Sequence, residues 1–212
     1  MTMRLASHNT FTFLTPRTLW MRLLAFTARC QRVNFDKQLD CGAQMFDLRV
    51  RFKDDPSWHA GSRTGSRPIV CHGLIEYESW PKVVDALQRL NNKGRESDIP
   101  FYLRVILEKR KPTEQDKERF RDLCQVLKNY HQNIIFFGGN DRSDWSCQHP
   151  IYDFGTPMPD IDEEHASTTA LFPRFPRLDD LWPWLYARLF NHRNIKKGTM
   201  HDWLMIDFVD IR

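Results

Sequence analysis

Residues 100–139 read PFYLRVILEKRKPTEQDKERFRDLCQVLKNYHQNIIFFGG, and their pattern sets the prediction of fold class. The apolar run at 100–109 predicts a strand, and the run at 133–139, closed by two glycines, predicts another. Between them, residues 113–130 have an amphipathic helical pattern, with Thr113 as N-cap and acidic residues in the first turn. Strand, helix and strand in this order predict a parallel α/β architecture.

The same order of elements extends outward along the chain. Further strands are predicted at 3–7, 44–52, 68–73 and 201–210, and further helices at 17–30, 79–94 and 178–194. In the helix at 79–94, Ser79 is expected to be the N-cap and Gly94 to follow the last turn. The Pro-rich segment 140–178 shows no clear periodicity, so we expect it to be an irregular insertion or a lid.

Composition excludes several classes of protein. No run of about 18 or more apolar residues occurs, so the sequence predicts no transmembrane helix. The first ten residues lack the apolar core of a secretory signal, so we expect a cytoplasmic protein, or a secreted one if a leader was removed. The 31 basic and 27 acidic residues are too balanced to indicate a nucleic-acid partner. Five scattered cysteines without a CxxC motif predict neither a disulfide framework nor a zinc site.

Polar residues stand in or directly after the predicted strands. Right-handed crossovers bring the carboxyl ends of parallel strands to one side, where barrels of this type collect their active-site residues. The candidates chosen by this rule are His8, Asp47, Arg49, His72, Glu108 and Asp207.

Three ordered blocks in this part of the chain resemble the X-region of phosphatidylinositol-specific phospholipase C. The blocks are ASHNTFTF (6–13), QLDCGAQMFDLRVRF (38–52) and PIVCHG (68–73). The family has a His followed by Asn or Asp in the first block, an acidic-apolar-Arg or acidic-apolar-acidic triplet in the second, and His-Gly in the third. Beyond residue 110 the likeness is general. The resemblance implies a distorted TIM-type (β/α) barrel, and we expect a single domain over residues 1–212.

The resemblance also implies roles for the matching residues. His8 would be the general base and His72 the general acid of a phosphodiester cleavage. Arg49 matches the residue that contacts the phosphate in the metal-independent bacterial branch, where the calcium-dependent eukaryotic branch has an acidic ligand. Asn9, a candidate substrate-binding residue, instead follows the eukaryotic pattern, because the bacterial branch has Asp there.

Three carboxylates complete the candidate site. Asp47 matches the acidic residue two positions before the arginine, and it is either catalytic or only that arginine's salt-bridge partner. Asp207 either orients His8 or caps a strand end. Glu108 is either a substrate hydroxyl acceptor or a surface carboxylate beside Lys109.

The residue types suit metal-free chemistry. Histidine has a pKa of about 6.5, which fits it to act as both base and acid near neutral pH. A guanidinium stabilises the extra negative charge on phosphorus without changing its protonation state. We therefore expect no cofactor. Calcium is the one alternative, and Arg49 disfavours it because it removes an oxygen ligand and adds positive charge.

The predicted function is a phosphoric diester lyase or hydrolase of the phosphatidylinositol phospholipase C type. Its substrate would be a phospholipid or a soluble phosphodiester. Peripheral membrane contact could come from Trp182 and Trp184, unless both pack in the core. One alternative is a non-catalytic barrel that binds a phosphorylated ligand. Another is a glycerophosphodiesterase-like or sphingomyelinase-D-like enzyme, although the triplet Asp47–Arg49 breaks the Glu-x-Asp metal pair of those families.

Overall fold

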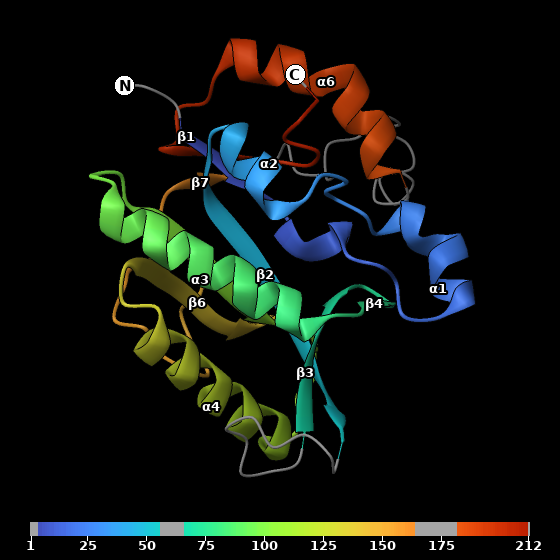
Figure 1. Cartoon of the computed structure of the whole chain (residues 1–212), viewed down its shortest axis with the longest axis vertical. Helices are drawn as coiled ribbons and strands as arrows, with labels where there is room; N and C mark the ends of the chain where they lie inside the picture. Colours follow the sequence, from blue (N-terminus) through green and yellow to red (C-terminus); the bar gives the residue numbers. More distant parts are fainter. Residues whose placement is uncertain (1–3, 56–65, 164–181, 212) are drawn as a thin grey trace. The chain divides into compact units, whose positions relative to one another are not determined.

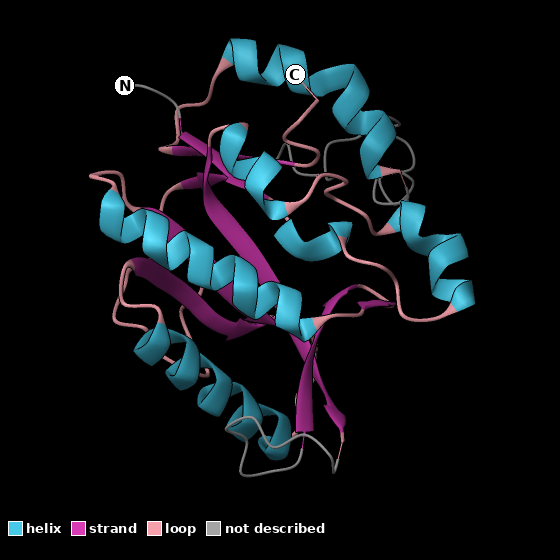
Figure 2. Ribbon diagram, in the orientation of Figure 1, coloured by secondary structure: helices cyan, strands magenta, loops and turns pink. Residues whose placement is uncertain are grey.

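The structure is a computed structural model that describes residues 4–55, 66–163 and 182–211. Its helices and strands alternate along the chain, which confirms the predicted α/β class (Figure 2). The chain divides into two compact units built from interleaved segments. Unit 1 comprises 1–47, 72–77 and 159–212, and unit 2 comprises 48–71 and 78–158. The single domain expected over the whole chain stays a prediction.

Unit 1 is built on parallel strands. Its strand order is β2, β1, β8, β7, and each neighbouring pair is parallel. The bounds are β1 (Arg4–Ser7), β2 (Ala43–Asp54, of which the first part belongs to this unit), β7 (Ile161–Asp162) and β8 (Trp203–Ile206). The register pairs Ser7 at the end of β1 with Phe46 on one side and with Ile206 on the other. This register determines which residues lie side by side directly after the paired residues.

Helices, 3-10 turns and one further strand complete the described part of unit 1. They are the 3-10 turns η1 (Thr10–Phe13) and η2 (Ala25–Thr27), the helices α1 (Leu19–Leu24), α2 (Phe35–Asp40) and α6 (Pro183–Lys197), and β4 (Ile75–Tyr77). The side chain of Thr18 caps α1 by accepting the N–H of Met21. The helix predicted at 17–30 therefore forms, but as a short α-helix followed by a 3-10 turn.

Unit 2 contains the βαβ arrangement that the sequence predicted. Its elements are the rest of β2, β3 (Ser66–His72, of which His72 belongs to unit 1), α3 (Trp80–Glu96), β5 (Phe101–Leu107), α4 (Glu114–Tyr130) and β6 (Ile134–Asp141). β5 and β6 are parallel neighbours, β5 also pairs with β2, and β3 is antiparallel to β2. Figure 1 shows α3 and α4, the two long green and olive helices, packed along β6.

The start of α4 is capped as its sequence predicted. The Thr113 hydroxyl accepts the N–H of Asp116 at 3.2 Å, and the Asp116 carboxylate accepts the N–H of Thr113 at 2.7 Å. Burial acts to raise the pKa of Asp116, but hydrogen bonds from Lys109 and Thr113 outweigh it and hold the pKa below its usual value. Local sequence therefore determines this helix start.

The end of α3 differs from the prediction. Ser79 is the N-cap as expected, although it has a left-handed backbone (φ 88°) and its side chain makes no capping hydrogen bond. The helix continues through Gly94 to Glu96. A Cβ atom at Gly94 would lie 2.4 Å from the carbonyl oxygen of Asn133, so this glycine permits close packing rather than ending the helix.

The segment predicted at 140–178 is only partly described. Strand β6 extends to Asp141, and between β6 and β7 the chain forms turns and bends. Residues 164–181 lie outside the described residues, so a lid at this place stays a prediction. Among the helices that the structure describes, none has the length and apolar character needed to cross a membrane.

Candidate active site

Three predicted site residues lie beside one another in unit 1: His8 and Asp207 directly follow β1 and β8, and Asp47 lies within β2. Because Ser7 pairs with Phe46 and with Ile206, the chain places His8, Asp47 and Asp207 next to one another at the same level of the sheet. The N–H of His8 continues this pairing by donating to the Ile206 carbonyl at 3.2 Å. Parallel register thus brings together residues from opposite ends of the chain.

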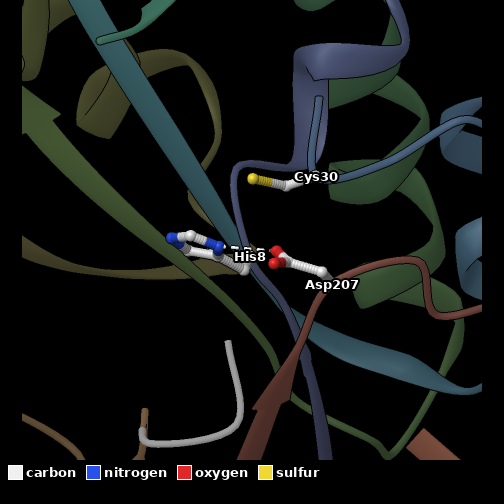
Figure 3. Close-up of side chains that lie close together, drawn as sticks. All are labelled: His8, Cys30 and Asp207. Atoms are coloured by element: carbon white, nitrogen blue, oxygen red, sulfur yellow. Dashed lines mark hydrogen bonds and ion pairs between the residues drawn. The ribbon is translucent and has the colours of Figure 1, made fainter. Parts of the chain in front are cut away.

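His8 and Asp207 form a buried pair. Nδ1 of His8 lies 2.7 Å from Oδ1 of Asp207, and the two side chains are 8% and 0% exposed. Figure 3 shows the Asp207 carboxylate facing the imidazole. A carboxylate in this position accepts the Nδ1 proton, so the neutral ring keeps its lone pair on Nε2. The geometry thus favours orientation of His8 over strand capping for Asp207.

Asn9 connects this pair to Asp47. It is buried and has a left-handed backbone (φ 44°), a conformation that asparagine adopts more readily than most residues. Its N–H donates to Oδ2 of Asp47 at 3.3 Å, and its amide Nδ2 lies 3.1 Å from Nε2 of His8. Asp47 therefore fixes the turn that follows β1, and Asn9 holds the outer edge of the imidazole.

Gln31 holds the same turn from the other side. Its fully buried amide donates to the carbonyls of His8 at 3.1 Å and Ile206 at 3.2 Å, and its oxygen accepts the N–H of Val209 at 3.1 Å. These bonds connect the segments that follow β1 and β8, which carry His8 and Asp207. No motif marks Gln31, so its place at the site could not be predicted from the sequence.

His72 lies at the end of β3, where Gly73 takes a left-handed backbone (φ 56°) and turns the chain. Its Nδ1 lies 2.8 Å from the Ala28 carbonyl, which can only accept, so Nδ1 donates and Nε2 remains for proton transfer. The His8 and His72 rings lie edge to face, with centroids 5.8 Å apart. Unit 1 therefore brings the predicted base and acid together.

Cys30 lies next to the catalytic candidates, although no sequence pattern indicated a role for it. The thiol is fully buried and forms no disulfide. Its Sγ lies 3.5 Å from Nδ1 of His72 and 3.7 Å from Nδ2 of Asn9. The residue follows η2 in a segment without a recognisable motif, so only the folded chain reveals this position.

Unit 2 carries the other two predicted site residues, Arg49 and Glu108. Glu108 is fully buried, with Oε2 3.7 Å from Arg49 and Oε1 3.2 Å from Arg142. The Arg49 guanidinium also lies over the ring of Trp145, 4.8 Å from its centroid. The alternative that Glu108 is a surface carboxylate beside Lys109 is therefore wrong. Two guanidiniums around one carboxylate leave a net positive charge, which suits an anionic ligand.

A pocket of about 340 Å³ lies in unit 2 beside this cluster. Its lining includes Arg51, Lys109, Arg110 and Arg142 together with Glu108. The excess of basic groups is appropriate for a phosphate. Arg142 was not predicted, because the strand predicted at 133–139 ends two residues before the observed end of β6 at Asp141, which Arg142 directly follows.

Sequence comparison gives no relatives: no family model and no curated protein matches this chain. Solved structures do match. The phosphatidylinositol-specific phospholipase C of Listeria monocytogenes superposes with a TM-score of 0.61 over 97% of this chain and 87% of its own, at 14% identity. The chain has the fold of a phosphatidylinositol-specific phospholipase C. The Staphylococcus aureus phospholipase C shows the same fold, with a TM-score of 0.51, 13% identity and coverage of 97% and 85%.

The phospholipase C fold confirms the resemblance that the sequence blocks indicated, together with the distorted barrel class. At 13–14% identity the likeness establishes the fold, and the chemistry must be argued from the site itself.

Proposed function

We propose that the protein is a phosphoric diester lyase of the phosphatidylinositol phospholipase C type. The observation that carries this proposal is the pair of imidazoles in unit 1, whose ring centroids lie 5.8 Å apart. The two rings are held in complementary ways, because Asp207 accepts from Nδ1 of His8 and the Ala28 carbonyl accepts from Nδ1 of His72. Both rings therefore keep Nε2 for proton transfer.

The reaction follows from these tautomers. Nε2 of His8 takes the proton of the inositol 2-hydroxyl, and that oxygen attacks phosphorus. The bond from phosphorus to the diacylglycerol oxygen breaks, and His72, protonated at Nε2, donates its proton to this leaving group. The products are a cyclic inositol phosphate and diacylglycerol, and water activated by the same groups can then open the cyclic ester.

Asp207 supports the base in this scheme. When His8 accepts a proton it becomes an imidazolium, and the fully buried carboxylate at 2.7 Å stabilises that charge. The carboxylate also prevents the ring from rotating, because the Nδ1 hydrogen bond fixes its plane. Asn9 restrains the opposite edge of the ring, and substrate would displace its amide from Nε2.

Arg49 is proposed to hold the phosphate oxygens, with Arg142 as a second cation of the same cluster. The pairing of both with Glu108 keeps them in place before substrate arrives. Since these guanidiniums supply positive charge permanently, the proposed reaction needs no calcium. This part of the proposal rests on charge and burial within unit 2.

A membrane substrate is supported by apolar side chains that unit 1 exposes to solvent. They lie on α1 and η2 and at the start of α6, and they are Leu19, Trp20, Leu23, Leu24, Phe26 and Trp182. The exposed fractions of Leu19 and Leu23 are 74% and 70%, which burial in a bilayer interface would reduce. Trp182 is half exposed and lies edge-on against Phe26. The alternative that Trp182 packs in the core is therefore wrong.

One observation favours the non-catalytic alternative. Asn9 stands where the bacterial enzymes of the resembled family have Asp, and its amide contacts the base nitrogen of His8. A barrel of this kind could bind a phosphorylated ligand without turnover. The catalytic assay separates the two proposals, because only the lyase forms a cyclic product.

The experiment is a substrate panel that compares phosphatidylinositol vesicles, phosphatidylcholine vesicles and a soluble inositol phosphodiester. We expect cleavage of the two inositol substrates and formation of a cyclic phosphate, detected by phosphorus NMR. Binding of inositol phosphate without cleavage of any substrate would instead support the non-catalytic barrel.

A further inference from the structure

We propose that His8, Cys30 and Asp207 form a binding site for a divalent cation of the zinc type, and that the bound ion switches off the general base. Only the inhibitory consequence rests on the proposed function. Metal binding itself depends on the three side chains alone, and it can be measured without any substrate.

The three donor atoms already lie together. A ring nitrogen of His8, Sγ of Cys30 and a carboxylate oxygen of Asp207 lie within 4.8 Å of one another (Figure 3). Tetrahedral zinc has bonds of about 2.3 Å to sulfur and about 2.0 Å to nitrogen or oxygen, which places its ligand atoms roughly 3.5 Å apart. Small side-chain rotations are therefore sufficient to close the site.

Asp207 supplies an independent reason to expect a ligand. Its side chain is fully buried, and Oδ2 has no hydrogen-bond partner among the residues that the structure describes. A buried carboxylate oxygen without a partner costs free energy, and a cation coordinated to it removes that cost. Oδ1 already faces His8, so the second oxygen lies in the same cluster.

The donor set determines the kind of ion. One sulfur, one nitrogen and one oxygen suit a borderline cation such as Zn²⁺, whereas Ca²⁺ and Mg²⁺ prefer oxygen ligands throughout. His72 is not part of the set, because its Nδ1 donates to the Ala28 carbonyl. Three protein ligands leave a fourth position for water. The ligands are far apart in sequence, which is why cysteine spacing predicted no zinc site.

Bound zinc is incompatible with general base catalysis by His8. If the ion occupies Nε2, it uses the lone pair that would accept the substrate proton. If it occupies Nδ1, the neutral ring carries its proton on Nε2 instead. In both cases the thiol of Cys30 loses a proton when it coordinates. His8 is 7% exposed, so the cluster is not fully closed to solvent.

The direct test titrates the metal-free full chain with Co²⁺ and Zn²⁺. We expect one tight site whose cobalt complex shows sulfur-to-metal charge-transfer absorption. Cys30→Ser should abolish that band and weaken Zn²⁺ affinity by about 100-fold or more. The matched control is Cys124→Ser, since Cys124 is also fully buried but lies on α4 of unit 2 and is not one of the three clustered ligands. It should bind as the unmodified protein does.

Zinc-edge X-ray absorption of the unmodified protein provides a readout that requires no variant. One sulfur ligand with nitrogen and oxygen ligands supports the site, and a shell without sulfur overturns it. Equal Zn²⁺ affinity in the Cys30→Ser and unmodified proteins, or no tight binding at all, also overturns it. If the chain binds zinc through sulfur yet cleaves no inositol lipid, the proposed function fails and the site stands. If the chain cleaves inositol lipids, zinc does not inhibit the cleavage and no tight zinc binding is found, the zinc site fails and the proposed function stands.

Discussion

Nδ1 of His8 lies 2.7 Å from Oδ1 of Asp207, although 199 positions separate the two residues in the sequence. Parallel pairing of β1 with β8 produces this contact, because Ser7 and Ile206 are register partners and the next residue of each strand is a site residue. The imidazole of His8 and the carboxylate of Asp207 are therefore held together by the sheet itself.

Replacing Asp207 by Asn should lower kcat by about 100- to 10,000-fold, because an amide can donate to Nδ1 and stabilise the wrong tautomer of His8. Steady-state turnover of phosphatidylinositol measures the effect, and circular dichroism checks the fold. Asp210→Asn is the control, since Asp210 pairs with the half-exposed Arg32. An unchanged kcat in the Asp207 variant would show that the carboxylate does not orient the base.

Replacing Arg49 by Lys should lower kcat/KM by about 100-fold, because the lysine keeps the charge but loses the planar guanidinium that donates two hydrogen bonds. A calcium chelator should leave the unmodified protein fully active. Arg89→Lys, which changes an exposed arginine paired with Asp85, serves as the control. Loss of activity on chelation would contradict the proposal that Arg49 replaces a metal.

Replacing Leu19 and Leu23 together by Ser should release the protein from inositol-lipid vesicles. Each buried leucine contributes about 1.5–3 kcal/mol of transfer free energy, so the partition coefficient should fall at least tenfold. Vesicle sedimentation measures binding, and turnover of a soluble phosphodiester should not change. Ile99→Ser, at another exposed apolar position, is the control. Equal sedimentation of all three proteins would show that α1 does not contact the membrane.

His131 should make the protein less stable in mild acid. Burial lowers its pKa, against the opposing hydrogen bond to the Leu127 carbonyl. The unfolded state therefore binds a proton at a higher pH, about 6.5, than the folded state does. The free energy of unfolding decreases as pH falls through this range.

The variant His131→Asn lacks this contribution. Its free energy of unfolding, from urea titrations between about pH 7.5 and about pH 5.5, should fall less than that of the unmodified protein. His192→Asn, at an exposed position on α6, should behave like the unmodified protein. Parallel curves for the His131 variant and the unmodified protein would contradict the assignment.

Local patterns predicted the elements of the fold well. The pattern at 100–139 predicted β5, α4 and β6, because two apolar runs flank an amphipathic helical segment whose start is marked by a capping residue. The predicted end of α3 was wrong, because Gly94 was interpreted as a helix stop signal. In the structure this glycine instead permits contact with the backbone of Asn133. Because the contact joins segments that are distant in the sequence, local sequence patterns could not predict it.

Some residues of the candidate site could likewise be predicted from the sequence and others could not. His8 and Asp207 could be predicted because the parallel strands β1 and β8 end at one edge, and Asp47 because it lies within a predicted strand. The resemblance supplied the proposed role of His72. Cys30 and Gln31 could not, because they lie after η2, outside any strand, and approach the site through tertiary packing.

The central claim is that His8 and His72 act as base and acid on an inositol phosphodiester. The most direct test is phosphorus NMR of phosphatidylinositol incubated with the unmodified protein, with His8→Ala and with His72→Ala. We expect a cyclic inositol phosphate from the unmodified protein and about 100-fold or greater loss of initial rate in each variant. No cyclic product from the unmodified protein, or an unchanged rate in either variant, would contradict it.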